Sequence, residues 1–228
     1  MKGTFLHPLL SLVFLAAGGV SLQAEETAPP LESLTFEQLD NFRNERKFTE
    51  IIAALQPEDL TSKAGEFGKD VDQLYALRAF AYAALKEGGA AEADYKRAIA
   101  ESPDDGRSSL HWFGLAENYR INLNDPKGAL PAYQKTVELC FARKYTNGWL
   151  PIGATISAAA ILCSESRYDE ALTQLQPYEG VMEGVAQVLQ IKLLKASAEA
   201  YLGKGQEGEA NARLQKAQDL EEKPDSTP

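Results

Sequence analysis

The chain has 228 residues, of which 44% are hydrophobic and 25% are charged, values that are ordinary for a single globular domain. Its 33 acidic residues outnumber its 23 Lys and Arg, and the resulting net charge of −10 argues against binding to nucleic acid or to anionic lipid headgroups. The acidic residues are spread along the sequence, which favours a solvated exterior over a cation-binding block.

Residues 1–24 have the layout of a secretory signal peptide. Lys2 provides a positive start, an apolar run extends from Leu9 to Ala17, and Ala24 is a small residue at the expected cleavage point. We expect this segment to be removed on export, leaving no membrane association. An uncleaved anchor is the alternative, although the run is shorter than the roughly 20 residues that cross a bilayer. Residues 25–34 are then expected to form a disordered lead into the fold.

Helical periodicity extends from residue 35 to residue 222, and residues 223–228 are expected to be a disordered tail. Ala, Leu, Glu, Lys and Gln dominate the periodic segments, and no stretch alternates as a strand does. Small residues and aromatics recur at intervals of about 34 residues, which indicates helix-turn-helix repeats. We predict about ten helices and no sheet in one repeat domain.

The first repeat copy is degenerate, and we interpret it as a capping repeat. It has no small residue at the helix crossing, and its apolar positions are Leu39, Phe42, Phe48, Ile51 and Leu55. Residues 57–70 form the longest joint and are expected to carry a short helix or a mobile loop.

The second copy, from Asp72 to Asp105, shows the pattern most clearly. Its matching residues at repeat positions 4, 8, 11, 20, 24, 27 and 32 are Tyr75, Ala79, Tyr82, Ala91, Tyr95, Ala98 and Pro103. The tyrosines at position 11 are expected to fill the core.

The remaining copies follow the same frame with local departures. The third, counted from Ser109, needs one extra residue in its turn at 124–126. The fourth, counted from Ile152, has a second helix that Pro177 is expected to shorten. The fifth, counted from Ile191, needs no gap, and its small residues are Ala198, Ala210 and Ala217.

This pattern resembles that of the tetratricopeptide repeat family, which reads W-x2-L-G-x2-Y, then A-x3-F, then P, with Ala here in place of the Gly at position 8. The resemblance implies an all-α, right-handed superhelical solenoid of about five antiparallel helix hairpins over residues 35–222. Small residues at positions 8 and 20 let the paired helices approach closely. Each hairpin then hides its remaining apolar face by stacking on the next.

The resemblance also implies that partners contact the first helix of each hairpin, at positions 2, 5, 9, 12 and 13, which line a concave groove. The partner-binding candidates at these positions are Phe80, Phe113, Glu117, Arg120, Ile156 and Glu199. The lining is mostly apolar and suits an amphipathic helix or an extended apolar peptide. It lacks the polar set that clamps the acidic tails of cytosolic chaperones. Residues 25–34 or a second copy of the chain are alternative occupants.

No acid, base, nucleophile or metal-ligand set converges in the sequence, so we expect no enzyme activity, cofactor or metal. His111 is the one histidine left after signal removal, and we expect it on a helix surface. The segment 203–208 reads G-x-G-x-x-G but follows a helix rather than a strand, which predicts a turn. Cys140 and Cys163 are expected to be separate buried thiols on successive helices, with a disulfide as the alternative.

The sequence therefore predicts a non-catalytic scaffold or adaptor in an extracytoplasmic compartment, periplasmic or secreted, that captures a protein, peptide or helix in its groove. The alternative is a structural homo-oligomer or an assembly subunit of a cell-envelope complex.

Overall fold

The computed structural model describes residues 35–56, 60–67, 70–102, 106–146, 148–178 and 184–222. The predictions made for residues 1–24, 25–34 and 223–228 lie outside these ranges. No strand occurs in the described ranges, which consist of helices and short connections.

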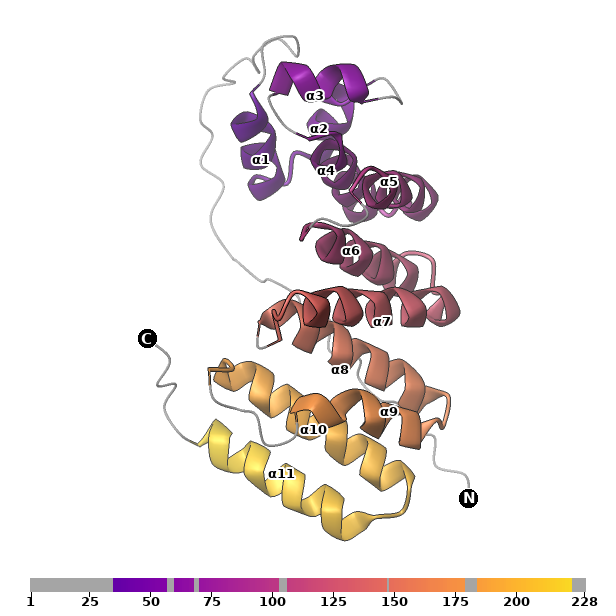
Figure 1. The fold of residues 1–228 in the computed structure, drawn as a ribbon, viewed down its shortest axis with the longest axis vertical. Helices are drawn as coiled ribbons and strands as arrows, with labels where there is room; N and C mark the ends of the chain where they lie inside the picture. Colours follow the sequence, from indigo (N-terminus) through magenta and orange to yellow (C-terminus); the bar gives the residue numbers. More distant parts are fainter. Residues whose placement is uncertain are drawn as a thin grey trace, which may run out of the picture.

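Five helical hairpins follow one another and stack from one end of the molecule to the other (Figure 1). This arrangement confirms the predicted all-α helical-repeat solenoid. The hairpins are α1 (Phe36–Asn44) with α2 (Phe48–Ala54), α4 (Val71–Ala84) with α5 (Gly88–Glu101), α6 (Ser108–Ile121) with α7 (Pro126–Ala142), α8 (Trp149–Ser164) with α9 (Tyr168–Leu175), and α10 (Gln187–Gly203) with α11 (Glu207–Glu221).

Two departures from a regular hairpin array were anticipated from helix-breaking residues. The joint after the first hairpin contains the short helix α3 (Thr61–Phe67). The backbone N–H of Leu60, just before α3, donates to the hydroxyl of Tyr75 on α4 at 3.2 Å, which ties the joint to the second hairpin. In the fourth hairpin, α9 has only 8 residues and gives way to the 3-10 helix η2 (Gln176–Tyr178), which contains Pro177.

All five hairpins close through the same backbone turn. Each turn has one residue with a positive φ between 50° and 73°, and these residues are Arg46, Lys86, Asn124, Ser166 and Gly205. The N–H of the next residue donates at 2.8 to 2.9 Å to the carbonyl of the residue at repeat position 11, which satisfies a carbonyl at the helix end. In the third hairpin this bond joins Asp125 to Tyr119 and spans one residue more than elsewhere. The predicted insertion is therefore confirmed.

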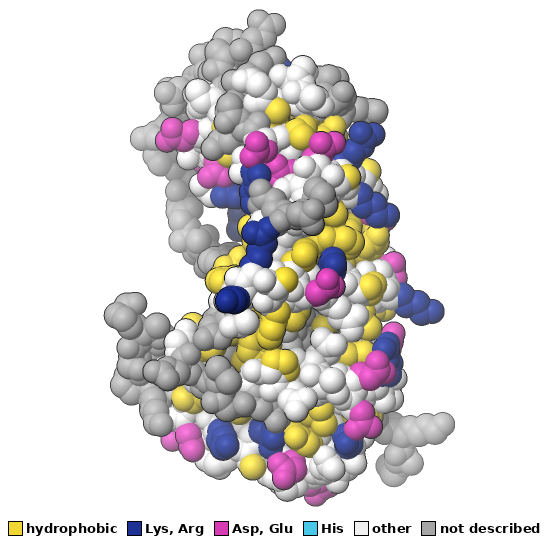
Figure 2. Space-filling view, viewed as in Figure 1, with side chains coloured by type: hydrophobic (Ala, Val, Ile, Leu, Met, Phe, Trp, Pro, Cys, Tyr) yellow, Lys and Arg dark blue, Asp and Glu magenta, His cyan; other side chains and the backbone are white. Residues whose placement is uncertain are grey.

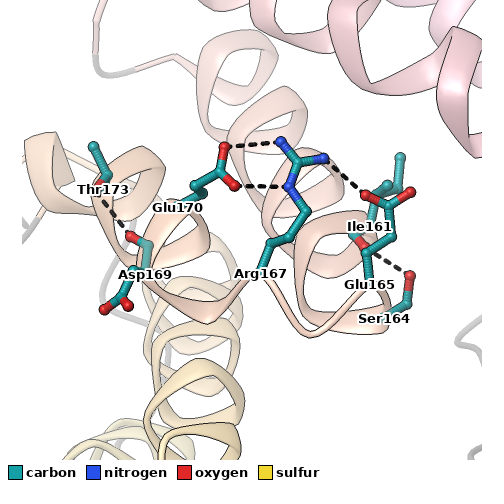
Figure 3. A network of polar contacts seen from close by, with 7 residues as sticks. All are labelled: Ile161, Ser164, Glu165, Arg167, Asp169, Glu170 and Thr173. Atoms are coloured by element: carbon teal, nitrogen blue, oxygen red, sulfur yellow. Dashed lines mark hydrogen bonds and ion pairs between the residues drawn. The ribbon is translucent and has the colours of Figure 1, made fainter.

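The fourth turn carries an ion-pair network on its surface (Figure 3). The Arg167 guanidinium donates two hydrogen bonds to Glu170, at 2.7 and 2.8 Å, and a third to Glu165, at 2.8 Å. These contacts, with Glu170 the stronger partner, raise the pKa of Arg167, and the same bond lowers the pKa of Glu170. Because the network is open to solvent, its contribution to stability is small.

The alanines of the repeat pattern lie in the core, where two helices meet. Ala79, Ala91 and Ala98 of the second hairpin are fully buried, as are Ala210 and Ala217 of the fifth. Buried small residues at these positions support the predicted repeat frame.

The tyrosines at position 11 are only partly in the core. Tyr82, Tyr119 and Tyr201 are each half-buried. The Tyr119 hydroxyl donates to Glu92 at 2.8 Å, and Arg213 donates to the Tyr201 hydroxyl at 3.2 Å. The prediction that these rings fill the core was therefore too strong, and the hydroxyls of Tyr119 and Tyr201 reach polar partners nearer the surface.

Cys140 near the end of α7 and Cys163 near the end of α8 are free, buried thiols. This agrees with the expectation of two separate cysteines that pack as small hydrophobic residues.

Candidate protein-binding surface

The six predicted binding residues lie on the first helices of four hairpins. Phe80 is on α4, Ile156 is on α8, Glu199 is on α10, and the other three are on α6. Phe80, Arg120 and Glu199 are exposed, and the rest are half-buried. We call the accessible side chains of α4, α6, α8 and α10 the first-helix face. Figure 2 shows hydrophobic side chains gathered in the middle of the visible surface, at the level of α6 to α8.

Phe113 lies at the centre of an aromatic group, the Phe113 cluster, which consists of Phe113, Tyr133 and Trp149. The Phe113 ring centroid is 5.9 Å from that of Tyr133 on α7 and 5.6 Å from that of Trp149 on α8, both edge to face. Tyr133 is buried, whereas Trp149 is 54% exposed. Gly153 follows Trp149 by one helical turn, and a Cβ there would lie 3.9 Å from Phe113 Cε2, which is an ordinary van der Waals contact and places this part of α8 beside the ring.

Three hydrogen bonds join the polar ends of the same side chains. Arg120 Nη2 donates to Glu117 at 2.6 Å, Arg120 Nε donates to the Tyr133 hydroxyl at 3.0 Å, and that hydroxyl donates to Glu117. Burial and then the charge of Glu117 raise the pKa of Tyr133. Burial lowers the pKa of Arg120, but the hydrogen bond and ion pair with Glu117 outweigh it and raise the pKa. The two charges offset each other, so the surface beside the Phe113 cluster is polar without net charge.

Phe80 belongs to a different part of the first-helix face. Its ring packs edge to face on Phe48 of α2, with centroids 5.9 Å apart, at the junction of the first two hairpins. No ring contact joins Phe80 to Phe113 in the described structure. The structure therefore separates the two phenylalanines that the sequence treated as one binding set.

Ile156 and Glu199 lie farther along the array. Ile156 packs against the buried core formed by the third to fifth hairpins. Glu199 on α10 is close enough to Cys163 on α8 to act on its ionisation, since burial and then the Glu199 charge raise the pKa of the thiol to about 11. Neither residue contributes to the Phe113 cluster.

Trp149 and Val188 are functional candidates that the sequence reasoning missed. They are the most exposed of the described large hydrophobic residues, at 54% and 57%. Each lies three residues before the first position of its repeat, because α8 and α10 begin earlier in the frame than α6 does. The apolar helical pattern continues back to Trp149 in the sequence, and this signal could have identified it.

His111 is buried, so the expectation of a helix-surface residue was wrong. It is 5% exposed, and its Nε2 lies 2.9 Å from Oδ2 of Asp72 in the first turn of α4. The other Asp72 oxygen is 3.5 Å from Arg107, which also pairs with Asp70 at 2.7 Å. The histidine links the second and third hairpins and holds α6 in place two residues before Phe113.

The glycine-rich segment 203–208 closes the fifth hairpin, as predicted. Gly205 supplies the positive φ of the turn, at 73°. Gly203 allows a close approach, since a Cβ there would lie 2.1 Å from Cε1 of Tyr168. Turn geometry and packing therefore explain this pattern.

Two chemical features are absent from the described part of the chain. No three His, Cys, Asp or Glu side chains there gather closely enough to hold a metal ion. Among the same residues, no helix has the length and apolar character needed to span a bilayer.

Comparison with known families finds no match, and comparison with curated protein sequences finds no significant similarity. Solved structures do share the fold. A crystal structure of MamA matches with a TM-score of 0.60 at 17% identity, covering 81% of this chain and 94% of that one. Kinesin light chain TPR-like repeats from Podosopora anserina match with a TM-score of 0.63 at 15% identity, covering 81% and 92%. BtubC (BKLC) from P. vanneervenii matches with a TM-score of 0.65 at 17% identity, covering 87% and 85%.

These matches extend over most of each chain, and the chain has the helical-repeat fold of tetratricopeptide repeat proteins. The fold expected from the resemblance in sequence is therefore confirmed. At these identities the comparisons establish the fold alone.

Proposed function

We propose that this protein is a non-catalytic scaffold that binds a peptide or helix of another protein along its first-helix face. The observation that carries the proposal is the Phe113 cluster, in which an accessible indole is held edge to face on a half-buried ring. Aromatic side chains anchored in this way are frequent energetic centres of protein interfaces. The fold supports the proposal because stacked hairpins present extended binding surfaces.

The proposed compartment is extracytoplasmic, either periplasmic or secreted. This part of the proposal rests on the charge and apolar pattern of residues 1–24. Fractionation of cells that express the full chain, compared with cells that express a chain lacking residues 2–24, tests it. Equal amounts of both forms in the cytoplasmic fraction would contradict the proposed export.

Site-specific photocrosslinking in the native compartment tests the binding face. A photoreactive residue in place of Trp149 should crosslink to a partner, whereas one in place of Leu214 should not. Leu214 is a suitable control because it is also an exposed apolar residue but lies on the second helix α11. With the partner identified, Trp149→Ala should weaken binding by about tenfold or more, because truncating an aromatic anchor costs of order 2 kcal/mol. A partner that crosslinks only at position 214 would refute the proposed face.

A homo-oligomer is the second candidate, and the fifth hairpin provides the observation that favours it. The residues at repeat position 24 of the second, third and fourth hairpins are Tyr95, Tyr133 and Leu175, and all three are buried. Leu214 occupies the same position in the fifth hairpin but is exposed, because no described hairpin follows α11. A second copy could cover this position. Light scattering on the mature chain separates the candidates, because a monomer at all concentrations argues against permanent self-assembly.

A further inference from the structure

Taken together, the second to fifth hairpins carry fewer acidic residues on their first helices than on their second helices. The first helices α4, α6, α8 and α10 contain three of them, whereas the second helices α5, α7, α9 and α11 contain ten. Of the three, Asp72 is buried against His111 and Glu117 is paired with Arg120. Glu199 is the one acidic residue that is exposed on these first helices. A strongly acidic chain therefore has a first-helix face with little negative charge.

The depletion of acidic residues is strongest where α7 leads into α8 and at the beginning of α10. The sequence has no Asp or Glu from 139 to 164 or from 184 to 198, and acidic residues resume at the borders of these segments. The same segments contain exposed Lys144 and Lys192. They also contain Arg143, whose Nη1 would be 3.3 Å from a Cβ at Gly106, so the end of α7 lies beside the approach to α6.

Exposed apolar side chains lie at the same end of the hairpins. The ends of α7 and the beginnings of α6, α8 and α10 share one side of the stack, on the left in Figure 1. In Figure 2, Lys and Arg side chains border the hydrophobic group on that side. We call this surface the basic apolar edge, and its exposed members are Leu110, Lys144, Tyr145, Trp149, Val188 and Lys192.

We propose that the basic apolar edge binds an acidic amphipathic segment of a partner protein. This inference rests on the proposed function and adds the chemistry of the partner. The apolar side chains of the segment cover Trp149 and Val188, and its carboxylates lie near Lys144 and Lys192. Charge complementarity carries the proposal, because the exposed members of this edge include Lys144 and Lys192 and no acidic side chain, although the chain has a net charge of −10.

A folded protein segment fits this surface better than a membrane does. An extended anionic bilayer would face the whole molecule and be repelled by its net negative charge. A short acidic segment meets only the edge, whose exposed members include Lys144 and Lys192 and no acidic side chain. The same reasoning disfavours nucleic acid, whose backbone extends well beyond such a small basic area.

The fluorescence of Trp149 provides a direct test. The chain contains two tryptophans, Trp112 and Trp149, so in a Trp112→Phe background the emission reports on the edge alone. The probes are a synthetic amphipathic helix of leucine and glutamate, the same peptide with lysine in place of glutamate, and the same peptide with serine in place of leucine. We expect the acidic leucine peptide to shift the emission to shorter wavelength and to bind about tenfold more tightly than the lysine peptide at low salt, with the difference shrinking as salt is added.

Charge reversal on the protein identifies the residues involved. Lys144→Glu with Lys192→Glu should weaken binding of the acidic peptide about tenfold or more. Lys127→Glu is the matched control, since Lys127 is also exposed but lies at the opposite end of α7. It should change binding less than about twofold. An equal loss of peptide binding in Lys127→Glu would overturn the assignment. Normal binding by both single variants would also overturn it, if circular dichroism shows that the double variant alone is misfolded.

The remaining outcomes separate this inference from the function on which it rests. Equal or tighter binding of the lysine peptide, or no response to any peptide, overturns the acidic-partner proposal. A shift caused by anionic phospholipid vesicles but not by the acidic peptide also overturns it, in favour of a membrane surface. If photocrosslinking at position 149 still captures a partner in any of these cases, the scaffold function stands and only the proposed chemistry of the partner fails.

Discussion

Gly114 on α6 lies against Tyr95 of the preceding hairpin, and its replacement by alanine tests how closely the two hairpins pack. A Cβ at position 114 would lie 2.5 Å from Cε1, 2.7 Å from Cζ and 2.9 Å from the hydroxyl oxygen of Tyr95. Tyr95 is buried in a cluster with Ala79, Ala91 and Leu115, so a shift of its ring would disturb these neighbours. Gly114→Ala should therefore push α6 away from α5 or force Tyr95 out of its rotamer.

The expected magnitude is the difference between two opposing effects. Replacing glycine by alanine within a helix normally stabilises a protein by up to about 1 kcal/mol. Overpacking a well-filled core costs about 1 to 3 kcal/mol. We expect a net loss of about 1 to 2 kcal/mol in the free energy of unfolding, because the added Cβ would lie too close to three atoms of a buried ring.

Gly208→Ala is the matched control and should have the opposite sign. Gly208 lies in α11 with no atom within 4 Å of its Cβ position, so alanine there should stabilise by about 0.5 kcal/mol. Urea unfolding followed by circular dichroism compares the two, and a difference of about 2 kcal/mol separates their midpoints by about 1 M at typical slopes. A Gly114→Ala midpoint equal to or above that of Gly208→Ala would refute the close packing of α6 on Tyr95.

Three further predictions concern the turns, the helix crossings and a buried thiol. Lys86→Gly should raise the melting temperature and stabilise the folded protein by up to about 1 kcal/mol, because Lys86 has a φ of 67° that glycine adopts without strain. A lower melting temperature would contradict this. Ala79→Leu and Ala198→Leu should each destabilise by about 1 to 3 kcal/mol in chemical unfolding, and two unchanged midpoints would count against the repeat frame. Cys163, with its pKa near 11, should react slowly with thiol reagents at pH 8 and faster up to about pH 11, and Glu199→Gln should move that rise to lower pH.

The sequence predicted the features that repeat and missed those that depend on one partner far away in the chain. The alanine positions and the five turns recur in every copy or nearly so, and recurrence separates them from chance. The extra residue in the turn around Asn124 was predictable because it interrupts an otherwise constant interval. The short α9 was predictable for a different reason, because Pro177 cannot continue a helix.

The candidate site was predicted less well, for physical reasons. His111 is buried because Asp72, 39 residues earlier, accepts its hydrogen bond, and no local pattern reveals that pairing. The Glu117 and Arg120 pair could have been expected from its spacing of three residues on a helix. The participation of Tyr133 could not, since it depends on how α7 crosses α6.

The shared turn also has a consequence for how the chain folds. Each hairpin closes with its own backbone hydrogen bond, over five residues in four hairpins and six in the third. The second helices of the last four hairpins pack mainly on helices next to them in sequence. Proteins with mostly local contacts fold quickly, because little chain entropy is lost before the first contacts form. Successive helix pairs can therefore form one after another, each providing a packing surface for the next pair in the chain.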